Sequence, residues 1–264
     1  MITDSKIRLA EPVLDSLSGV HAWFSLKAAN LQQPEGHIPG INVGFHTDAP
    51  EQEIHANRER LYKELGLNSC NVAWATQVHS TRVMQVNHGG RFEETDALVS
   101  DVPGVTLAIQ VADCAAVLLA DPISRIVGAA HAGWRGAVEG VVPSVLAKMV
   151  ERGAKPEHIS AWVSPCIGSS RFEVGPEVAD RFPVSLKRPG AGDRWYVDLK
   201  GLVRRQLLNE GLFETNLDIH PGCTVRDANS WYSWRRERTL SGRMMALIGL
   251  NPTTDSSKQA ADNR

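Results

Sequence analysis

Short, almost continuously apolar segments recur along this 264-residue chain and restrict the folds that it can adopt. Each has the length and the branched side chains that are typical of a β-strand. The segments are Val72–Thr76, Arg82–Val86, Ala97–Ser100, Val105–Val111, Ala116–Ala120, Arg125–Ala130, Ile159–Ser164 and Met244–Leu250. Because a segment such as Val105–Val111 shows no polar alternation, we expect helices or a second sheet to cover both faces of its sheet.

Three longer segments repeat apolar residues at helical spacing, at 48–66, 138–150 and 198–209. Pro143 lies inside the second of them, so that helix either begins near Val142 or kinks there, because proline lacks an N–H donor and clashes with the preceding turn. Several strands follow one another without an intervening helix. We therefore predict an α/β (α+β) sandwich, with mixed β-sheets flanked by helices in a single domain.

The domain is expected to span residues 1–250. Residues 251–264 contain no aromatic or branched apolar side chain, so they cannot bury enough surface to offset the entropy of ordering. We predict a disordered tail there. The first residues carry charged side chains where a secretory signal needs an unbroken apolar stretch, and we expect a cytoplasmic protein.

Charge gives the chain no strong overall field, because 28 Lys and Arg residues nearly balance 30 Asp and Glu residues, for a net charge of −2. A nucleic-acid or anionic-membrane partner would favour a basic protein. The longest uncharged apolar run, Val102–Ala112, is far shorter than the roughly 20 residues of a membrane helix. We expect small-molecule partners, no nucleic acid, no membrane, and a monomer or weak homo-oligomer.

Reactive side chains stand at the ends of three predicted strands. His79 follows one strand, Cys114 precedes another, and His131 follows a third. Two imidazoles and a thiolate are a full protein ligand set for a catalytic zinc ion, which lowers the pKa of a coordinated water to about 7. Asp113 adjoins the thiolate and is a candidate general base or hydrogen-bond acceptor near the metal. Taken singly, however, a buried cysteine or a histidine after a strand is usually structural.

Further residues are candidates for holding an anionic or purine substrate. Arg58, Arg135 and Arg171 offer guanidinium groups that match phosphate, although most arginines pair with surface carboxylates. Trp134 offers a ring for stacking or belongs to the core. Glu173, flanked by apolar residues, either binds ribose hydroxyls or anchors Arg235 or Arg236.

The C-terminal part of the chain carries a second group of arginines. They follow Trp234 as the pair Arg235 and Arg236, and Arg243 comes shortly before the last predicted strand. We interpret this stretch and Arg243 as a structural charged network that fixes the last strand.

The sequence is similar to the YfiH family, also labelled the multicopper polyphenol oxidoreductase or laccase domain, purine nucleoside phosphorylase and peptidoglycan editing factor. The resemblance rests on QVHS, ADCAAVLLAD, HAGWRG, PCIGSSRFEVGPEV and YSWRRERTLSGRMM, and runs from about Asn42 to Ile248. It implies one α/β sandwich and metal ligation by the residues that match His79, Cys114 and His131. It also implies purine nucleoside phosphorylase activity, with adenosine deaminase and methylthioadenosine phosphorylase side activities.

These considerations lead to the prediction of a zinc-dependent purine nucleoside phosphorylase. Catalysis is assigned to Cys114, His79, His131 and Asp113, and substrate binding to Asn42, Arg58, Arg135 and Glu173. Trp234 stands where the family commonly has tyrosine, and Leu240 is an insertion; such departures concern pocket shape more than the three metal ligands.

Three alternatives stay open at this point. A His and Cys ligand set also suits copper, and a copper polyphenol oxidase would fit the family's older label. None of the nine histidines forms an H-x-H pair, however, and a multicopper cluster needs many clustered imidazoles. A second alternative is a cysteine- or metal-dependent amidase that edits peptidoglycan precursors, with Cys114 as nucleophile. A third is a binding module that zinc stabilises.

Overall fold

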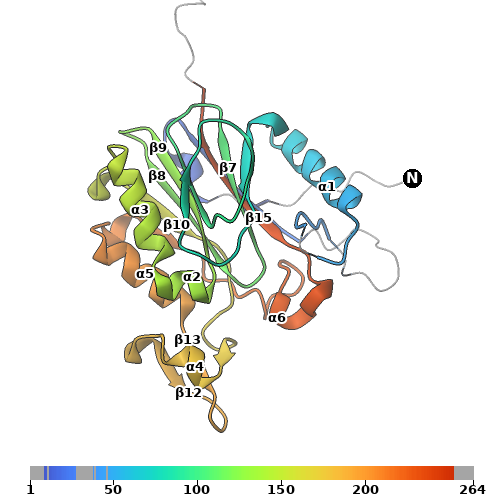
Figure 1. Cartoon of the computed structure of the whole chain (residues 1–264), viewed down its shortest axis with the longest axis vertical. Coiled ribbons are helices and arrows are strands. Elements are labelled where there is room, and N and C mark those ends of the chain that lie inside the picture. Colours follow the sequence, from blue (N-terminus) through green and yellow to red (C-terminus); the bar gives the residue numbers. More distant parts are fainter. Residues whose placement is uncertain (1–8, 11, 28–37, 39, 46, 253–264) are drawn as a thin grey trace, which may run out of the picture.

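Two six-stranded sheets stack against each other in the computed structural model, which describes residues 9–10, 12–27, 38, 40–45 and 47–252 (Figure 1). The first sheet has the order β1 (Leu9–Ala10), β2 (Val20–Ser25), β15 (Met244–Leu250), β7 (Thr106–Val111), β3 (Val72–Ala75), β5 (Gly90–Phe92). The second has the order β14 (Leu217–Ile219), β10 (Ser160–Val163), β8 (Ala115–Asp121), β9 (Ile126–Ala132), β6 (Ala97–Ser100), β4 (Val83–Gln85). Each sheet combines parallel and antiparallel pairs, which confirms the predicted mixed sheets.

One hydrophobic core lies between the facing sides of the two sheets. Phe24 of β2 contacts Trp162 of β10, with 5.5 Å between the ring centroids, and Ile109 and Leu118 are fully buried in the same cluster. The strands in both sheets therefore bury one side chain face against the other sheet. Their continuous apolarity means that the opposite face is buried as well.

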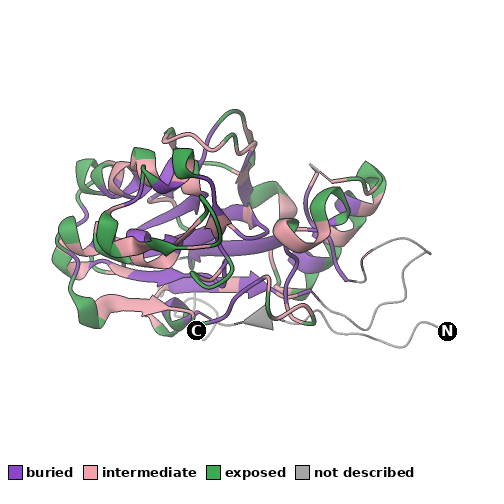
Figure 2. Ribbon diagram, turned by 90° about the horizontal axis from the view of Figure 1, so that it is seen from below, coloured by how far each residue is buried: buried purple, intermediate pink, exposed green. Residues whose placement is uncertain are grey.

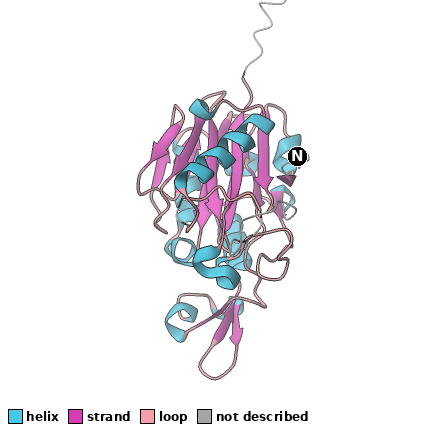
Figure 3. Cartoon of the chain, turned by 90° about the vertical axis from the view of Figure 1, so that its right-hand side faces the viewer, coloured by secondary structure: helices cyan, strands magenta, loops and turns pink. Residues whose placement is uncertain are grey.

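Helices cover those opposite faces. On the first sheet, α1 (Glu51–Glu64) packs Leu61 and Tyr62 against β3, β7 and β15 (Figure 3). On the second sheet lie α3 (Val141–Glu151) and α5 (Leu199–Asn209). Gly128 of β9 permits the close approach of α3, because a Cβ atom there would lie 2.8 Å from the sulfur of Met149. Figure 2 shows the resulting layers, with buried strands inside and exposed residues on the outer sides of the helices.

The predicted helix at 138–150 is divided in two. Gly140 takes a positive φ of 96° and separates α2 (Trp134–Glu139) from α3. Pro143 lies in the first turn of α3, where its missing N–H group breaks no helical hydrogen bond. The alternative in which the helix begins near Val142, rather than kinking there, is thereby confirmed.

A small antiparallel sheet projects from one end of the sandwich (Figures 1 and 3). It contains β11 (Glu173–Val174), β13 (Trp195–Val197) and β12 (Lys187–Pro189), with α4 (Pro176–Ala179) beside it. The short helix α6 (Trp234–Glu237) precedes β15. Six 3₁₀ helices complete the described elements, at Val13–Ser16, Ser69–Asn71, Pro156–His158, Val184–Leu186, Glu214–Asn216 and Arg238–Leu240.

The described residues include only the first two residues of the predicted C-terminal tail. The predicted tail begins at Asn251, but residues 253–264 lie outside the described residues, as do residues 1–8. Among the described helices, none has both the length and the apolar character needed to cross a bilayer.

Candidate active site

His79, Cys114 and His131 meet at the ends of three strands, as the sequence predicted. His79 follows β3, Cys114 immediately precedes β8, and His131 lies near the end of β9. One ligand atom of each lies within 4.8 Å of the others, and Cys114 Sγ is 3.9 Å from His79 Nε2. Ligands of a tetrahedral zinc ion lie about 3.3–3.6 Å apart, given its usual bond lengths. Small side-chain shifts would therefore fit these three residues around one ion.

Backbone close to the three side chains is shaped to admit such an ion. His79 has a positive φ of 63°, and Asp113 beside Cys114 has a φ of 82°. A non-glycine residue in this region costs on the order of 1 kcal/mol, and such strain concentrates at functional sites. Gly133 faces the same space, since a Cβ atom there would lie 2.7 Å from His79 Cδ2 and 3.0 Å from Cys114 Sγ. A side chain at residue 133 would fill the space between the ligands.

Asp96 connects the two histidines, and the sequence analysis missed it. Its fully buried carboxylate accepts a hydrogen bond of 2.8 Å from His131 Nδ1, which leaves Nε2 of that ring for a metal. The same carboxylate accepts the backbone N–H groups of Val78, His79 and Ser80 and the Ser80 hydroxyl. One carboxylate thus orients the His131 ring and holds the strained turn that carries His79.

Electrostatic coupling favours a thiolate at this site even without a metal. Burial raises the pKa of the Cys114 thiol, but the charge and hydrogen bond of His131, with a further contribution from His79, lower it to about 6. Burial lowers the pKa of His131, but Cys114 and Asp96 raise it. For Asp96, the hydrogen bond and charge of His131 and the Ser80 contacts outweigh burial and lower the pKa to about 2. The thiolate is the form that binds metals.

Asp113 uses both carboxylate oxygens to hold neighbouring segments. Its Oδ1 accepts a 2.6 Å hydrogen bond from the Thr224 hydroxyl, and its Oδ2 accepts one of 2.5 Å from the Arg235 backbone N–H. Its carbonyl accepts from the Ile167 N–H. The carboxylate therefore ties the turn that carries Cys114 to α6, a positioning contact; the predicted role as general base stays a prediction.

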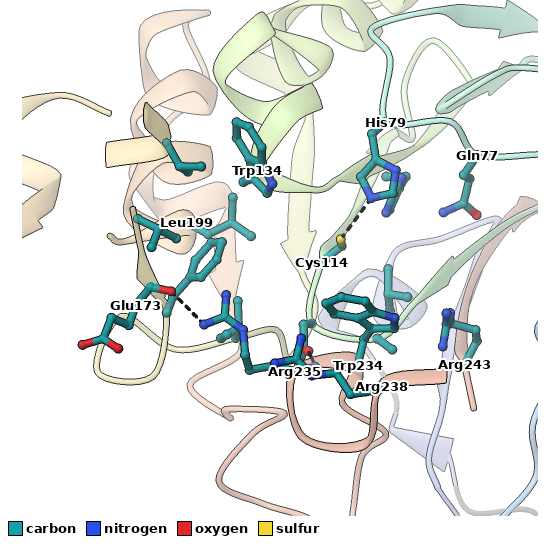
Figure 4. A pocket seen from close by; sticks show the side chains of 18 of the residues that line it. Gln77, His79, Cys114, Trp134, Glu173, Leu199, Trp234, Arg235, Arg238 and Arg243 are labelled. Carbon is teal, nitrogen blue, oxygen red and sulfur yellow. Dashed lines mark hydrogen bonds between the residues drawn. The ribbon is translucent and has the colours of Figure 1, made fainter. Parts of the chain in front are cut away.

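A cavity of about 690 Å³ opens over the three candidate metal ligands (Figure 4). Its size lies within the range of roughly 300–1,000 Å³ that small-molecule sites occupy. Trp134, Phe172 and Trp234 contribute aromatic rings to its walls, and Glu173 lines it from the projecting sheet. The site is thus a cavity that combines a candidate metal-ligand set, aromatic surfaces and a carboxylate.

Comparisons with known proteins agree with this architecture. Residues 22–251 match the family described as multi-copper polyphenol oxidoreductase laccase. A protein of Deinococcus radiodurans named purine nucleoside phosphorylase is 38% identical over 241 residues, which cover 89% of this chain and 90% of that protein. The purine nucleoside phosphorylase YfiH of Escherichia coli strain K12 is 33% identical over 252 residues, covering 92% and 99%. The chain belongs to the YfiH family.

Solved structures of the YfiH family share the whole fold. The hypothetical protein YfiH of Bacillus licheniformis superposes with a TM-score of 0.85 at 28% identity, covering 95% of this chain and 98% of that one. YlmD of Geobacillus stearothermophilus gives a TM-score of 0.86 at 26% identity, with the same coverage. These similarities confirm the predicted single α/β sandwich.

The four residues predicted to bind substrate in this YfiH-family chain have different positions. Glu173 lines the cavity, and its carbonyl accepts a hydrogen bond from Arg235, so it also anchors that arginine. Arg135 is exposed and lies over the Trp134 ring, outside the residues that line the cavity. Asn42 and Arg58 also lie outside that lining. A substrate contact by these last three stays a prediction.

Asn42 and Arg58 instead support one wall of the cavity. Arg58 is buried between the rings of Phe45 and Trp74, and its Nε donates to the Val43 carbonyl. The Asn42 side-chain oxygen accepts from the backbone N–H groups of Gly44 and Arg243. Because Arg243 lines the cavity, the segment from residue 42 to 44 positions a cavity residue without reaching the cavity itself.

Sequence reasoning underestimated the arginines that precede β15. Arg236 does have the predicted structural role, because it donates to the carbonyls of Thr224, Val225 and Trp231. Arg235 and Arg243, however, line the cavity, and so does Arg238. The only signal in the sequence was their density, which is equally typical of a surface network.

Proposed function

We propose that this chain is a zinc-dependent purine nucleoside phosphorylase, which converts adenosine, inosine or guanosine and phosphate into the free base and ribose 1-phosphate. The observation that carries this proposal is the joint presence of a His–Cys–His set, aromatic rings and arginines around one cavity. The names of the relatives from Deinococcus radiodurans and Escherichia coli, both called purine nucleoside phosphorylase, support it.

Phosphorolysis sets clear demands on such a cavity. A phosphate oxygen forms a bond to C1′ of the ribose while the bond from C1′ to the purine nitrogen breaks. The base leaves with the electron pair and takes up a proton. The protein must hold an anion beside the ribose, bind the flat base and stabilise the charge that moves between them.

The lining residues can meet these demands. Trp134, Phe172 and Trp234 offer faces on which a purine can stack, and Glu173 offers a carboxylate to ribose hydroxyls. A zinc ion held by His79, Cys114 and His131 would act as a Lewis acid and lower the pKa of a coordinated water molecule. That property would also suit adenosine deamination, in which water replaces the amino group and ammonia leaves. We include this activity and methylthioadenosine phosphorolysis in the proposal.

Zinc fits the proposal better than a multicopper centre. In the part of the chain that the structure describes, His79, Cys114 and His131 form the one cluster with ligand atoms close enough for a metal. A multicopper oxidase would need further imidazole ligands beside it. Metal analysis of protein purified without added metal tests this point: stoichiometric copper with a visible thiolate absorption band would overturn the assignment of zinc.

The decisive assay combines metal and phosphate as variables. Chelated and zinc-reconstituted protein are each incubated with adenosine, with and without phosphate, and adenine, inosine and ribose 1-phosphate are measured. The proposal predicts ribose 1-phosphate only when both zinc and phosphate are present, and inosine with zinc alone. A zinc-loaded protein that forms no product in any condition would overturn it.

A cysteine-dependent amidase acting on peptidoglycan precursors is the second candidate. It is favoured by the low pKa of Cys114, about 6, and by the neighbouring His131, which together resemble an activated nucleophile. The two candidates differ in the intermediate that they form. Mass spectrometry of the protein trapped with such a precursor would show an acyl group on Cys114 for the amidase and an unmodified thiol for the phosphorylase.

A further inference from the structure

Three arginines form one side of the cavity. Arg235, Arg238 and Arg243, which we call the arginine wall, all come from one short segment that ends at β15. Figure 4 shows them together with Trp234 on the side of the cavity that faces Cys114 and His79. Three guanidinium groups on one side of a cavity are typical of a site that binds an anion.

Neighbouring charges on the same segment are already neutralised. The buried Glu237 carboxylate pairs with Lys27 at 3.3 Å and with Arg236 at 2.7 Å, and it also accepts the Ser233 N–H. Arg236 is directed away from the cavity by its bonds to backbone carbonyls. The carboxylate nearest in sequence to the arginine wall therefore pairs with Lys27 and Arg236, and not with the cavity-lining Arg235 or Arg238.

Arg235 and Arg238 keep donors for a ligand. Arg235 donates one N–H group to the Glu173 carbonyl, and a guanidinium has five such groups. Arg238 stacks on the Trp234 ring at 5.0 Å. Within the described chain, neither arginine has a carboxylate at ion-pair distance, whereas Arg152 and Arg204 on other surfaces each do.

The backbone of Arg238 is strained, which supports a functional role for this cavity-lining residue. This residue has a φ of 56° and a ψ of −132°, an unusual conformation for a residue with a side chain. Such conformations persist where the surroundings impose them, and they concentrate at ligand sites. Ser233 caps α6 by accepting from the Arg236 N–H, and Asp113 accepts from the Arg235 N–H, so the segment is fixed immediately before the strained residue.

Arg243 is held in place by packing of its aliphatic stem against Gly44 and by hydrogen bonds to backbone groups. Its Nη1 donates to the carbonyls of Ser241 and Gly242 at 2.7 and 3.0 Å, and its backbone N–H donates to Asn42. Gly44 lies against the stem so closely that a Cβ atom there would be 2.2 Å from Arg243 Cγ. A charge fixed in this way needs little reorganisation when an anion binds.

We propose that the arginine wall binds the phosphate co-substrate, in the space between Trp234 and the His79, Cys114 and His131 ligand set. This inference rests on the proposed phosphorylase function and names the residues that recognise its inorganic substrate. Guanidinium groups match phosphate oxygens in pairs of hydrogen bonds. Glu173 and Glu177 line the part of the cavity formed by the projecting sheet, which leaves that part for neutral hydroxyl groups rather than for an anion.

Protection from chemical modification tests the proposal without any assay of activity. Zinc-loaded protein is treated with phenylglyoxal, which modifies guanidinium groups, in phosphate or in chloride at equal ionic strength, and peptides are quantified by mass spectrometry. Phosphate should slow modification of Arg235 and Arg238 at least fivefold and leave the exposed Arg152 unchanged. Equal rates in phosphate and chloride at all three residues would overturn the proposal.

Kinetics of three variants give a second, independent test. Arg238→Gln removes an exposed guanidinium, and Arg243→Lys keeps the charge and the stem but loses paired hydrogen bonding. Each should raise KM for phosphate at least tenfold and leave KM for the nucleoside within about twofold. Arg152→Gln, at the C-terminal end of α3 and outside the cavity lining, is the matched control and should change neither value. Unchanged phosphate KM in both wall variants would contradict the proposal.

The outcomes separate the anion site from the reaction. If phosphate protects the wall but no nucleoside is cleaved, the anion site stands and the proposed reaction is wrong. If nucleosides are cleaved with phosphate and both wall variants retain the wild-type KM for it, the reaction stands and phosphate binds elsewhere.

Discussion

The candidate metal ligands and the arginine wall face the same cavity, yet they reach it from different kinds of structure. His79, Cys114 and His131 stand at the ends of strands in two stacked sheets, and Asp96 links the two histidines. The arginine wall comes from a short helix and a turn whose direction depends on Ser233, Asp113 and Asn42. The candidate metal ligands are thus positioned by the sheets, whereas the proposed anion site depends on how one connecting segment is fixed.

Removing a metal ligand should have the largest effect and should separate the two regions. In Cys114→Ala the thiolate is lost, so zinc affinity should fall more than a hundredfold, beyond the 10–100-fold typical of residues that only orient ligands. Nucleoside conversion should be abolished. Phosphate should still protect Arg238 from phenylglyoxal, measured by peptide mass spectrometry. Stoichiometric zinc in this variant, measured by plasma mass spectrometry, would refute the ligand set.

Asp96→Asn should produce the next largest effect. The new amide NH₂ group is a donor, and it would face N–H groups that now donate hydrogen bonds to the carboxylate. We expect the free energy of unfolding to fall by about 3 kcal/mol and the zinc affinity to fall about 10–100-fold. Competition with a chromophoric chelator and urea unfolding measure the two quantities.

Asp121→Asn is the matched control for this experiment. Asp121 is also fully buried, and its carboxylate accepts the backbone N–H groups of Ile123, Ser124 and Lys155, away from the cavity. It should destabilise the fold to a comparable degree without changing zinc affinity. Equal loss of zinc affinity in both variants would mean that Asp96 acts only through stability.

Gly133→Ala tests the space between the metal ligands. Gly133 has a φ of −69°, which alanine adopts freely, so the added methyl should leave the fold intact. Its contact with His79 Cδ2 and Cys114 Sγ should displace the ligands and lower zinc affinity about tenfold, a smaller loss than for the missing carboxylate. Wild-type zinc affinity with an unchanged melting temperature would show that the ligands close around the ion differently.

Asn42→Ala should have the smallest effect on substrate binding, and it acts on the arginine wall through Arg243. Loss of the amide oxygen leaves the N–H groups of Gly44 and Arg243 without their acceptor, at a cost of about 1–3 kcal/mol in free energy of unfolding. KM for phosphate should rise only about threefold, because Arg243 is loosened rather than removed, and zinc content should not change. An increase as large as that of Arg238→Gln would instead support the direct substrate contact that the sequence predicted.

The same contrast explains what the sequence could predict. The eight continuous apolar segments, from Val72–Thr76 to Met244–Leu250, all contain strands in the structure. They could be predicted because strands that are buried on both faces leave a strong compositional pattern. Strand β2 was missed because His21 and Ser25 interrupt its apolar residues, and the strands of the projecting sheet are too short to show any period. The cluster of His79, Cys114 and His131 was recognisable from its residue types and their positions at strand ends.

Residues that act through distant partners were not recognisable. Asp96 stands in an ordinary polar stretch before β6, and its partners lie 16 to 35 residues away in the sequence. Arg235 and Arg236 are adjacent and identical in type, but one faces the cavity and the other the carbonyls of the 224–231 loop. Their division is decided by contacts with Asp113 and with the carbonyls of Thr224 and Val225, which lie outside this segment and which no local pattern encodes.

Anomalous diffraction from crystals of the zinc-loaded protein, soaked in phosphate and measured on both sides of the zinc absorption edge, tests the central claim most directly. We predict one zinc peak bonded to His79, Cys114 and His131, and a phosphate in the same cavity with oxygens within hydrogen-bond distance of Arg238 and Arg243. A zinc peak away from these ligands, or a phosphate bound only outside the cavity, would contradict the account.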